Sequence, residues 1–265
     1  MSNPFAPSVG GILSADIAVP EHDRELRFYS RVLTTGEHPL WRDDLTNNRG
    51  MPIIGLGARS AEYEKLPLQW MPHIQVADVA TSAARALELG GDALMQSTDE
   101  GESSPWAVLL DPDGAAFGII PVVSDDSVPQ DEGGASRDAA EGAGRIAWLS
   151  LTVSDALATR DFYRQVVGWS VQDVEMEDAD GAYLDYDMLD DDGKPAARVS
   201  HARGANLGLP PVWLIGLPVG DLRASLRRVR EGGGEILKAT QGTDGTYAYA
   251  VIQDPVGACL ALVPG

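Results

Sequence analysis

The sequence has little cysteine, little positive charge and no long apolar run. Its one cysteine, Cys259, excludes an internal disulfide framework and any metal site built from several cysteines. The 20 basic residues are outnumbered by 40 acidic ones, which gives a formal charge of −20. Such a charge repels nucleic-acid phosphates and anionic membrane surfaces, so we expect neither as a partner.

The apolar runs are also too short to span a membrane. Runs such as residues 107–110 and 117–123 are far below the ~18 residues that a membrane-spanning helix needs. The first residues lack a basic segment followed by an apolar one, which argues against a secretory signal. We therefore expect a cytoplasmic protein. Cys259 follows a turn-forming Asp-Pro-Val-Gly sequence and is expected to be a buried apolar residue, not a nucleophile.

What the sequence does contain is a tandem repeat. One set of residues recurs after 134 positions: Val19, Phe28 and Tyr29 are matched by Val153, Phe162 and Tyr163. A second set recurs after 143 positions: Trp70, Asp78, Asp111, Pro112 and Gly114 are matched by Trp213, Asp221, Asp254, Pro255 and Gly257. The longer second offset indicates an insertion in the second copy. A repeat of this period fixes the architecture before any other feature is considered.

The repeat and the composition divide the chain into two domains. Residues 124–143 are rich in Asp, Glu, Gly, Ala and Ser, which is typical of a linker. The linker separates a first domain at 8–123 from a second at 144–265. A length of 265 residues agrees with two domains.

Each copy divides again into two modules. Four amphipathic helical stretches each follow a short apolar strand, at residues 17–19, 74–76, 151–153 and 217–219. In the second stretch the expected apolar face is Val79, Ala83, Ala86 and Leu87, and Ser154 is expected to cap the third. Short β-like runs and turn tetrapeptides follow each helix. The pattern predicts an α+β fold of four βαβββ modules.

Several of these residues carry a family resemblance. The set consists of Val153-Ser154-Asp155, Phe162-Tyr163 and Val167-Gly168-Trp169, followed by Asp-Pro-x-Gly-Ala near each domain end. In this order the set resembles the vicinal oxygen chelate superfamily, which includes glyoxalase I, bleomycin-resistance proteins and extradiol dioxygenases. The resemblance covers nearly the whole chain except the linker. It implies tandem glyoxalase-like domains, in which the modules form two open eight-stranded cups that each hold a small molecule.

The metal positions implied by this resemblance carry unsuitable residues. Metal-using members place His, Gln or Glu at the first strand of each module and Glu in the last strand. The corresponding positions here are Ser14, Met71 and Gly118 in the first domain and Trp148, Leu214 and Ala261 in the second. A divalent ion needs several converging nitrogen or oxygen ligands, so we expect no metal and no other cofactor.

Asp16 and His73 are the candidate catalytic pair in the first cup. Each lies two residues beyond a metal position and therefore on the same side of its strand. A carboxylate beside an imidazole can fix its tautomer and support acid–base catalysis. A pair of polar groups that only line a ligand cup, or that only stabilise the structure, would look the same. Ser150 and Gly216 hold the equivalent positions in the second domain.

The second cup offers different candidates for ligand binding. Arg198 and His201 follow a predicted hairpin at 190–193, where the first copy has Gly55 and Ala58. An arginine in a cup supplies a donor fork for a carboxylate or phosphate. Alternatively, Arg198 lies on the outer face and pairs with Asp185 or Asp187. The other predicted ligand-binding residues are Trp70, Trp148 and Ser150.

Three functions remain open at this level. The first is a protein that binds a small organic molecule in one or both cups without the usual metal. The second is a metal-independent lyase, isomerase or hydroxylase-like enzyme that uses Asp16 and His73. The third is a scaffold or regulatory protein whose cups have degenerated. We expect a small-molecule ligand as the partner, and either a monomer with an internal pseudo-dimer or a homodimer.

Overall fold

A computed structural model describes residues 7–33, 44–46, 52–97, 105–123 and 146–265. The predicted linker at 124–143 lies outside the described residues. Among the described residues, no helix is long and apolar enough to cross a membrane.

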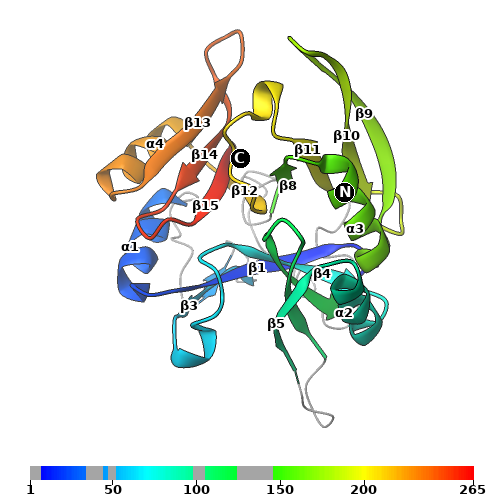
Figure 1. The fold of residues 1–265 in the computed structure, drawn as a ribbon. Coiled ribbons are helices and arrows are strands. Elements are labelled where there is room, and N and C mark those ends of the chain that lie inside the picture. Colours follow the sequence, from blue (N-terminus) through cyan, green and yellow to red (C-terminus); the bar gives the residue numbers. More distant parts are fainter. Residues whose placement is uncertain (1–6, 34–43, 47–51, 98–104, 124–145) are drawn as a thin grey trace, which may run out of the picture. The chain divides into compact units, whose positions relative to one another are not determined.

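The elements follow the order strand, helix, strands four times along the chain (Figure 1). The first module contains β1 (Ile12–Val19), α1 (His22–Val32), β2 (Asp44–Thr46) and β3 (Pro52–Ala58). The second contains β4 (Met71–Val76), α2 (Val79–Glu88), β5 (Asp92–Gln96), β6 (Ala107–Leu110) and β7 (Ala116–Pro121). The third contains β8 (Trp148–Val153), α3 (Ala156–Val167), β9 (Ser170–Asp178), β10 (Gly181–Leu189) and β11 (Pro195–His201). The fourth contains β12 (Leu214–Val219), α4 (Leu222–Glu231), β13 (Glu235–Gln241), β14 (Tyr247–Gln253) and β15 (Cys259–Pro264).

Each module pairs its strands in the same way. The first strand runs parallel to the last, as in β8 with β11 and β12 with β15. The last strand is antiparallel to the one before it, as in β10 with β11 and β14 with β15. Among the described residues, the strands of the first two modules belong to a seven-stranded mixed sheet and those of the last two to an eight-stranded one. The α+β class and the fourfold order of strand, helix and strands are therefore confirmed. The first module differs from the predicted βαβββ pattern, since only two strands follow its helix among the described residues.

Tertiary contacts divide the chain into two compact units, which are described separately. Unit 1 comprises Met1–Leu13, Met71–Val128 and Leu149–Trp213, and unit 2 comprises Ser14–Trp70, Pro129–Trp148 and Leu214–Gly265. The helices α2 and α3 contact each other in unit 1, and α1 and α4 contact each other in unit 2 (Figure 1). The domain boundaries at 8–123 and 144–265, which come from the sequence repeat, stay a prediction.

Aspartates begin three of the four helices. Asp78, Asp155 and Asp221 each accept a hydrogen bond from a backbone N–H three residues later. The expectation that Ser154 caps α3 is wrong, because the Asp155 carboxylate reaches the Ala158 N–H instead, at 3.0 Å. Helix α3 ends at Gly168, whose φ of 94° lies in the left-handed region that suits glycine.

The apolar faces of α2 and α4 are buried as their sequence period predicts, except for one residue of α2. Val79, Ala83 and Ala86 of α2 are buried, as are Leu222 and Val229 of α4. Leu87, which was expected on the apolar face of α2, is 50% exposed. The apolar stripe of α2 is therefore narrower than the sequence suggests.

A buried triad of hydrogen bonds explains part of the repeat in unit 1. The Tyr163 hydroxyl donates to Asp111 Oδ2 at 3.0 Å and accepts from Trp213 Nε1 at 2.9 Å. The other carboxylate oxygen of Asp111 accepts the backbone N–H groups of Asp113 and Ala115. Burial raises the pKa of Asp111 to about 6. The triad ties the β6–β7 turn to helix α3 through side chains that leave no buried donor unpaired.

Unit 2 contains the same triad. The Tyr29 hydroxyl donates to Asp254 Oδ2 at 2.7 Å and accepts from Trp70 Nε1 at 3.2 Å. Asp254 in turn accepts the Val256 and Ala258 N–H groups. The repeated Tyr, Trp and Asp of the sequence are therefore structural partners, and each triad joins residues from both copies.

Candidate functional site

The strand register confirms the predicted equivalence of the two copies. In the first module, Gly55 of β3 lies opposite Asp16 of β1. In the third module, Arg198 of β11 lies opposite Ser150 of β8. Because Asp16 and Ser150 are equivalent in the repeat, Arg198 replaces a glycine at the same place in the sheet.

Arg198 forms a bidentate ion pair within unit 1. Its Nε and Nη2 donate to Asp187 Oδ1 and Oδ2 at 2.8 and 3.2 Å. These bonds, together with the charges of Asp187 and Asp185, raise the pKa of Arg198 against the opposing effect of burial. The Arg198 side chain is 41% exposed. The pairing with Asp187 was one of the two alternatives that the sequence left open, and Nη1 is not used in this pair.

Asp185 and His201 form a second polar contact on the same two strands. The strand ladder between β10 and β11 reaches Tyr186 and Val199. Beyond it, Asp185 Oδ1 accepts the His201 backbone N–H at 2.8 Å and lies 3.3 Å from His201 Nδ1. The carboxylate thus takes the place of a backbone acceptor and orients the imidazole.

The second oxygen of Asp185 has no hydrogen-bond partner among the described residues. The Asp185 side chain is 1% exposed, whereas that of His201 is 22% exposed. Buried carboxylate oxygens in folded proteins nearly always accept a hydrogen bond. Asp185 Oδ2 is therefore an acceptor site that the described residues leave open.

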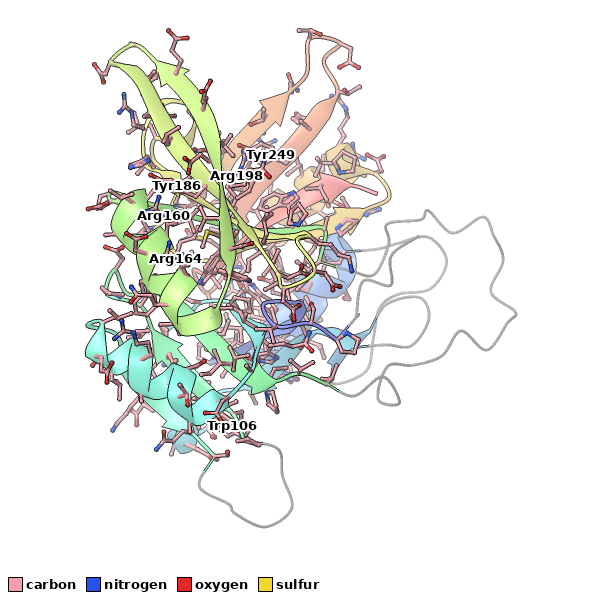
Figure 2. All side chains as sticks on the ribbon, turned by 90° about the vertical axis from the view of Figure 1, so that its right-hand side faces the viewer. Trp106, Arg160, Arg164, Tyr186, Arg198 and Tyr249 are labelled. Carbon is pink, nitrogen blue, oxygen red and sulfur yellow. The ribbon has the colours of Figure 1, made fainter. Side chains whose placement is uncertain are left out.

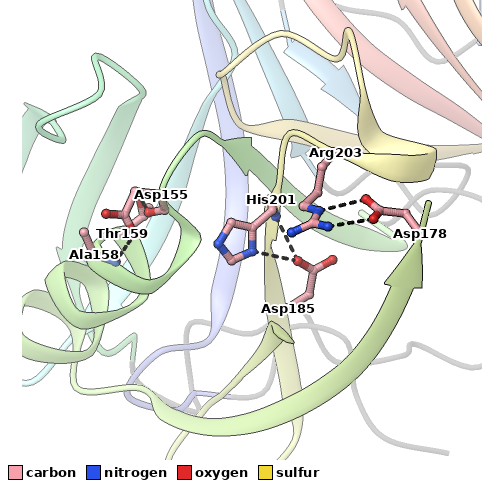
Figure 3. Close-up of polar contacts among 7 residues, drawn as sticks. All are labelled: Asp155, Ala158, Thr159, Asp178, Asp185, His201 and Arg203. Atoms are coloured by element: carbon pink, nitrogen blue, oxygen red, sulfur yellow. Dashed lines mark hydrogen bonds and ion pairs between the residues drawn. The ribbon is translucent and has the colours of Figure 1, made fainter. Parts of the chain in front are cut away.

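A third polar contact borders this pair (Figure 3). Arg203 donates from Nε and Nη2 to Asp178 at 2.8 and 2.6 Å, and this bond lowers the pKa of Asp178 to about 2. The Arg203 guanidinium also lies over the Tyr183 ring, 4.2 Å from its centre. The same ring meets the His201 imidazole edge to face at 5.8 Å. We call the residues Asp178, Tyr183, Asp185, Asp187, Arg198, His201 and Arg203 the β10–β11 polar cluster.

The apolar side chains of these strands pack against helix α3. Tyr186, Met188 and Val199 are buried, and Arg160 of α3 lies over the Tyr186 ring at 4.5 Å (Figure 2). Because side chains alternate along a strand, Arg198 and Asp187 point to the opposite side from Val199 and Tyr186. The Arg198–Asp187 pair therefore lies on the sheet face away from α3.

Sequence reasoning missed Asp185 as a site residue. It was considered only as a possible partner of Arg198, because one aspartate among 40 acidic residues gives no signal of its own. The position of Asp185 in the hairpin could have indicated its role. Asp185 and Asp187 are two residues apart and share a strand face with Arg198 across the turn.

The other predicted site residues lie as follows. Trp70 is fully buried and its indole nitrogen is bonded to Tyr29, which gives it a structural role in unit 2. Trp148 is partly buried, packs over Gly216 and meets Tyr249 edge to face at 6.1 Å. Ser150 of β8 is partly buried.

Asp16 and His73 belong to different compact units, and each is described in its own. Asp16 is partly buried on β1 in unit 2. His73 is partly buried on β4 in unit 1, where its imidazole covers the Gly118 backbone. A Cβ at Gly118 would lie 2.8 Å from the ring, so the absence of a side chain there makes room for the imidazole.

The family's metal positions do not fit a divalent ion. Met71, Leu214 and Ala261 are buried apolar residues, and neither the Trp148 indole nor the Gly118 position supplies a ligand. Within the described ranges, no group of three His, Cys, Asp or Glu side chains is placed to hold a metal ion.

Family profiles match both copies of the repeat. The glyoxalase/bleomycin resistance protein/dioxygenase superfamily profile matches residues 145–262, and a glyoxalase-like domain profile matches residues 14–120. The chain belongs to this superfamily. The resemblance that the sequence motifs suggested is confirmed.

The curated relatives of this superfamily member match less than half of it. DnrV of Streptomyces peucetius, an anthracycline biosynthesis protein, is 29% identical over 131 residues, which cover 45% of this chain and 46% of DnrV. CFP32 of Mycobacterium bovis, provisionally described as a glyoxylase, is 28% identical over 116 residues, or 43% of each chain. The chain thus spans less than half the length of these relatives.

Solved structures of the superfamily match over nearly the full chain. A catechol 2,3-dioxygenase has a TM-score of 0.54 at 15% identity, with 98% of this chain and 94% of that chain covered. A variant of 4-hydroxymandelate synthase from Streptomyces coelicolor has a TM-score of 0.52 at 13% identity, with 98% and 93% covered. At these identities the similarity establishes the tandem fold alone.

Proposed function

We propose that this superfamily member binds a small organic molecule through the β10–β11 polar cluster, without a metal of the usual family kind. The observation that supports this most directly is the buried Asp185 Oδ2, which has no partner among the described residues. A hydroxyl or amino group of a ligand would supply the missing donor.

The neighbouring arginine adds a second anchor. Arg198 Nη1 is not used in the bidentate pair with Asp187 and can donate to a carbonyl or carboxylate oxygen of the ligand. Its side chain is 41% exposed and therefore within reach of a ligand. The two anchors favour a ligand that carries a hydroxyl or amine near a carbonyl or carboxylate. Anthracycline-type compounds are a natural first set, given the name of DnrV.

A second candidate function is proton transfer on the bound molecule. It is favoured by the contact of 3.3 Å between Asp185 Oδ1 and His201 Nδ1. A carboxylate in this position holds the imidazole in one tautomer, which is the arrangement used for general acid–base catalysis. Asp16 and His73 remain the alternative acid–base residues proposed from the sequence.

Binding is tested first with the protein purified gently and examined by native mass spectrometry, then by calorimetry. The calorimetric screen covers hydroxylated aromatic compounds, small carboxylates and thioethers. For any ligand found, Asp185→Asn is expected to lower affinity about 5- to 150-fold, because the amide presents a donor where the ligand needs an acceptor. His201→Ala and Arg198→Ala are expected to weaken binding as well.

Arg164→Ala is the matched control, since Arg164 is an exposed arginine of α3 that does not belong to the cluster (Figure 2). Its affinity should equal that of the wild type. Unchanged binding in Asp185→Asn and His201→Ala, with a loss in Asp16→Asn or His73→Ala, would move the site to the first domain. A screen without any ligand would favour the scaffold or regulatory alternative.

The metal question has its own measurement. Elemental analysis of the dialysed protein is expected to give well below one equivalent of Zn, Ni, Fe or Mn, because the family's ligand positions carry unsuitable residues. Stoichiometric metal that is lost in His73→Ala would contradict this and would restore a metal-dependent glyoxalase or dioxygenase activity as the leading hypothesis.

A further inference from the structure

A groove in unit 2 is lined by residues of helix α4 and of strands β13 and β14. These three elements lie side by side (Figure 1). It has a volume of about 340 Å³. Arg223, Arg227 and Arg230 line it from the helix, and Ile236 and Tyr247 line it from the strands. A volume of this size falls in the range of small-molecule sites, about 300 to 1,000 Å³.

The three arginines form one face of α4. Their spacing of four and three residues places them on the same side of a helix. All three are exposed, whereas Leu222 and Val229 on the other side of the helix are buried in the core. Arg223 also lies over the Tyr247 ring, 5.4 Å from its centre.

The guanidinium groups of this face have no acidic partner among the described residues. Within the part of the chain that the structure describes, ion pairs join five other arginines to carboxylates, namely Arg24, Arg85, Arg160, Arg198 and Arg203. No such ion pair involves Arg223, Arg227 or Arg230. In a chain with 40 acidic and 20 basic residues, three unpaired cations side by side are an unusual concentration of positive charge.

The floor of the groove is apolar. Leu226 is 4% exposed and lies between the arginines in sequence, and Ile236 and Tyr247 face the same space from the sheet. A bare inorganic ion would leave this apolar surface in water. A ligand with both an anionic group and an apolar body would use the two kinds of surface together.

We propose that this groove binds an organic anion, in which a carboxylate or phosphate group is carried on an aromatic or aliphatic body. The anionic group lies between Arg227 and Arg230, whose planar guanidinium groups donate paired hydrogen bonds to such oxygens. The apolar body packs on Leu226 and against the Tyr247 ring. This site is separate from the β10–β11 polar cluster and does not depend on the proposed function.

The test is a calorimetric titration of the full-length protein with 1-naphthyl phosphate. The comparison ligands are 1-naphthol, which lacks the anionic group, and inorganic phosphate, which lacks the apolar body. We expect 1-naphthyl phosphate to bind at least about tenfold more tightly than either. Equal binding of 1-naphthol would show that the arginines do not take part and would overturn the proposal.

Variants then locate the site. Arg227→Ala and Arg230→Ala should each weaken 1-naphthyl phosphate binding at least about tenfold, because each removes a charged hydrogen-bond donor. Arg164→Ala, which removes the same charge from α3, should leave the affinity unchanged, as should Asp185→Asn in the β10–β11 polar cluster. Binding that survives in both groove variants, or that is lost in Asp185→Asn, would overturn the assignment.

A final arm addresses a macromolecular partner. A hexaglutamate peptide carries negative charge without the apolar body, so it should bind more weakly than 1-naphthyl phosphate. Tighter binding of the peptide would contradict the proposal and would identify the groove as a surface for acidic proteins.

Discussion

Glu25→Gln is expected to stabilise the protein at pH 9 by about 1 to 3 kcal/mol, with little change at pH 5. Glu25 lies on α1 in unit 2 and is 0% exposed. Neither of its carboxylate oxygens accepts a hydrogen bond from the described residues. Burial first, and then the negative charge of Asp254, raise the pKa of Glu25 from 4.5 to about 8. The protein therefore favours the neutral carboxyl group.

The direction of the pH dependence follows from this shift. The folded state holds the Glu25 proton more tightly than the unfolded state does. The stabilisation that this proton gives to the folded state is therefore fully present below pH 4.5 and is lost as pH rises through about 8. Glutamine resembles the neutral carboxyl group in shape and does not ionise. The variant should therefore lose less stability than the wild type as pH increases.

Urea unfolding followed by circular dichroism at pH 5, 7 and 9 measures the effect. Glu62→Gln is the matched control, since Glu62 is exposed in unit 2 and should leave the pH profile unchanged. A Glu25→Gln variant that is less stable than the wild type at pH 9 would show that the charged carboxylate is stabilised by a partner. In the second copy of the repeat, the position equivalent to Glu25 is Thr159, whose side chain does not ionise.

The module pattern could be predicted from the sequence because it depends on local signals. Period-two strands, amphipathic helices and Asp-Pro turns each occupy fewer than about fifteen residues, and the repeat shows each of them twice. The predicted equivalence of Arg198 and Gly55 is also confirmed. The ladders β1–β3 and β8–β11 have no register shift, so Gly55 pairs with Asp16 in the first copy as Arg198 pairs with Ser150 in the second.

The triads could not be predicted, because their members are distant in sequence. Tyr29 and Asp254 are 225 residues apart, and Tyr163 and Asp111 are 52 apart. The repeat showed that Tyr, Trp and Asp each occur twice, but it gave no sign that the tyrosine of one copy bonds the aspartate of the other. Trp70 was therefore expected to contact a ligand, whereas its indole nitrogen is bonded to Tyr29.

The partner of Arg198 depended on a backbone irregularity. The β10–β11 register shifts by one residue between Met188 and Leu189, next to the hairpin turn. A hairpin without this bulge would place Arg198 opposite Tyr186, on the wrong face for an ion pair. The sequence left both Asp185 and Asp187 open because nothing in it locates the bulge.

Trp213→Ala is expected to destabilise the protein by about 3 to 5 kcal/mol. Trp213 is 0% exposed, meets the Tyr163 ring at 5.1 Å between centres and donates its indole N–H to the Tyr163 hydroxyl at 2.9 Å. Alanine leaves a cavity in the core and removes this donor. Trp106→Ala is the matched control, because Trp106 is only partly buried.

The free energy of unfolding is measured by urea titration with far-ultraviolet circular dichroism, since the loss of a tryptophan alters fluorescence. A cost for Trp213→Ala no larger than that for Trp106→Ala would contradict the structural role of the triad. The variants Trp213→Phe and Tyr163→Phe then separate the energetic cost of losing the hydrogen bonds from the cost of the cavity. If the triad acts as one unit, the double variant should cost less than the sum of the single ones, because each single change already leaves a buried polar group without its partner.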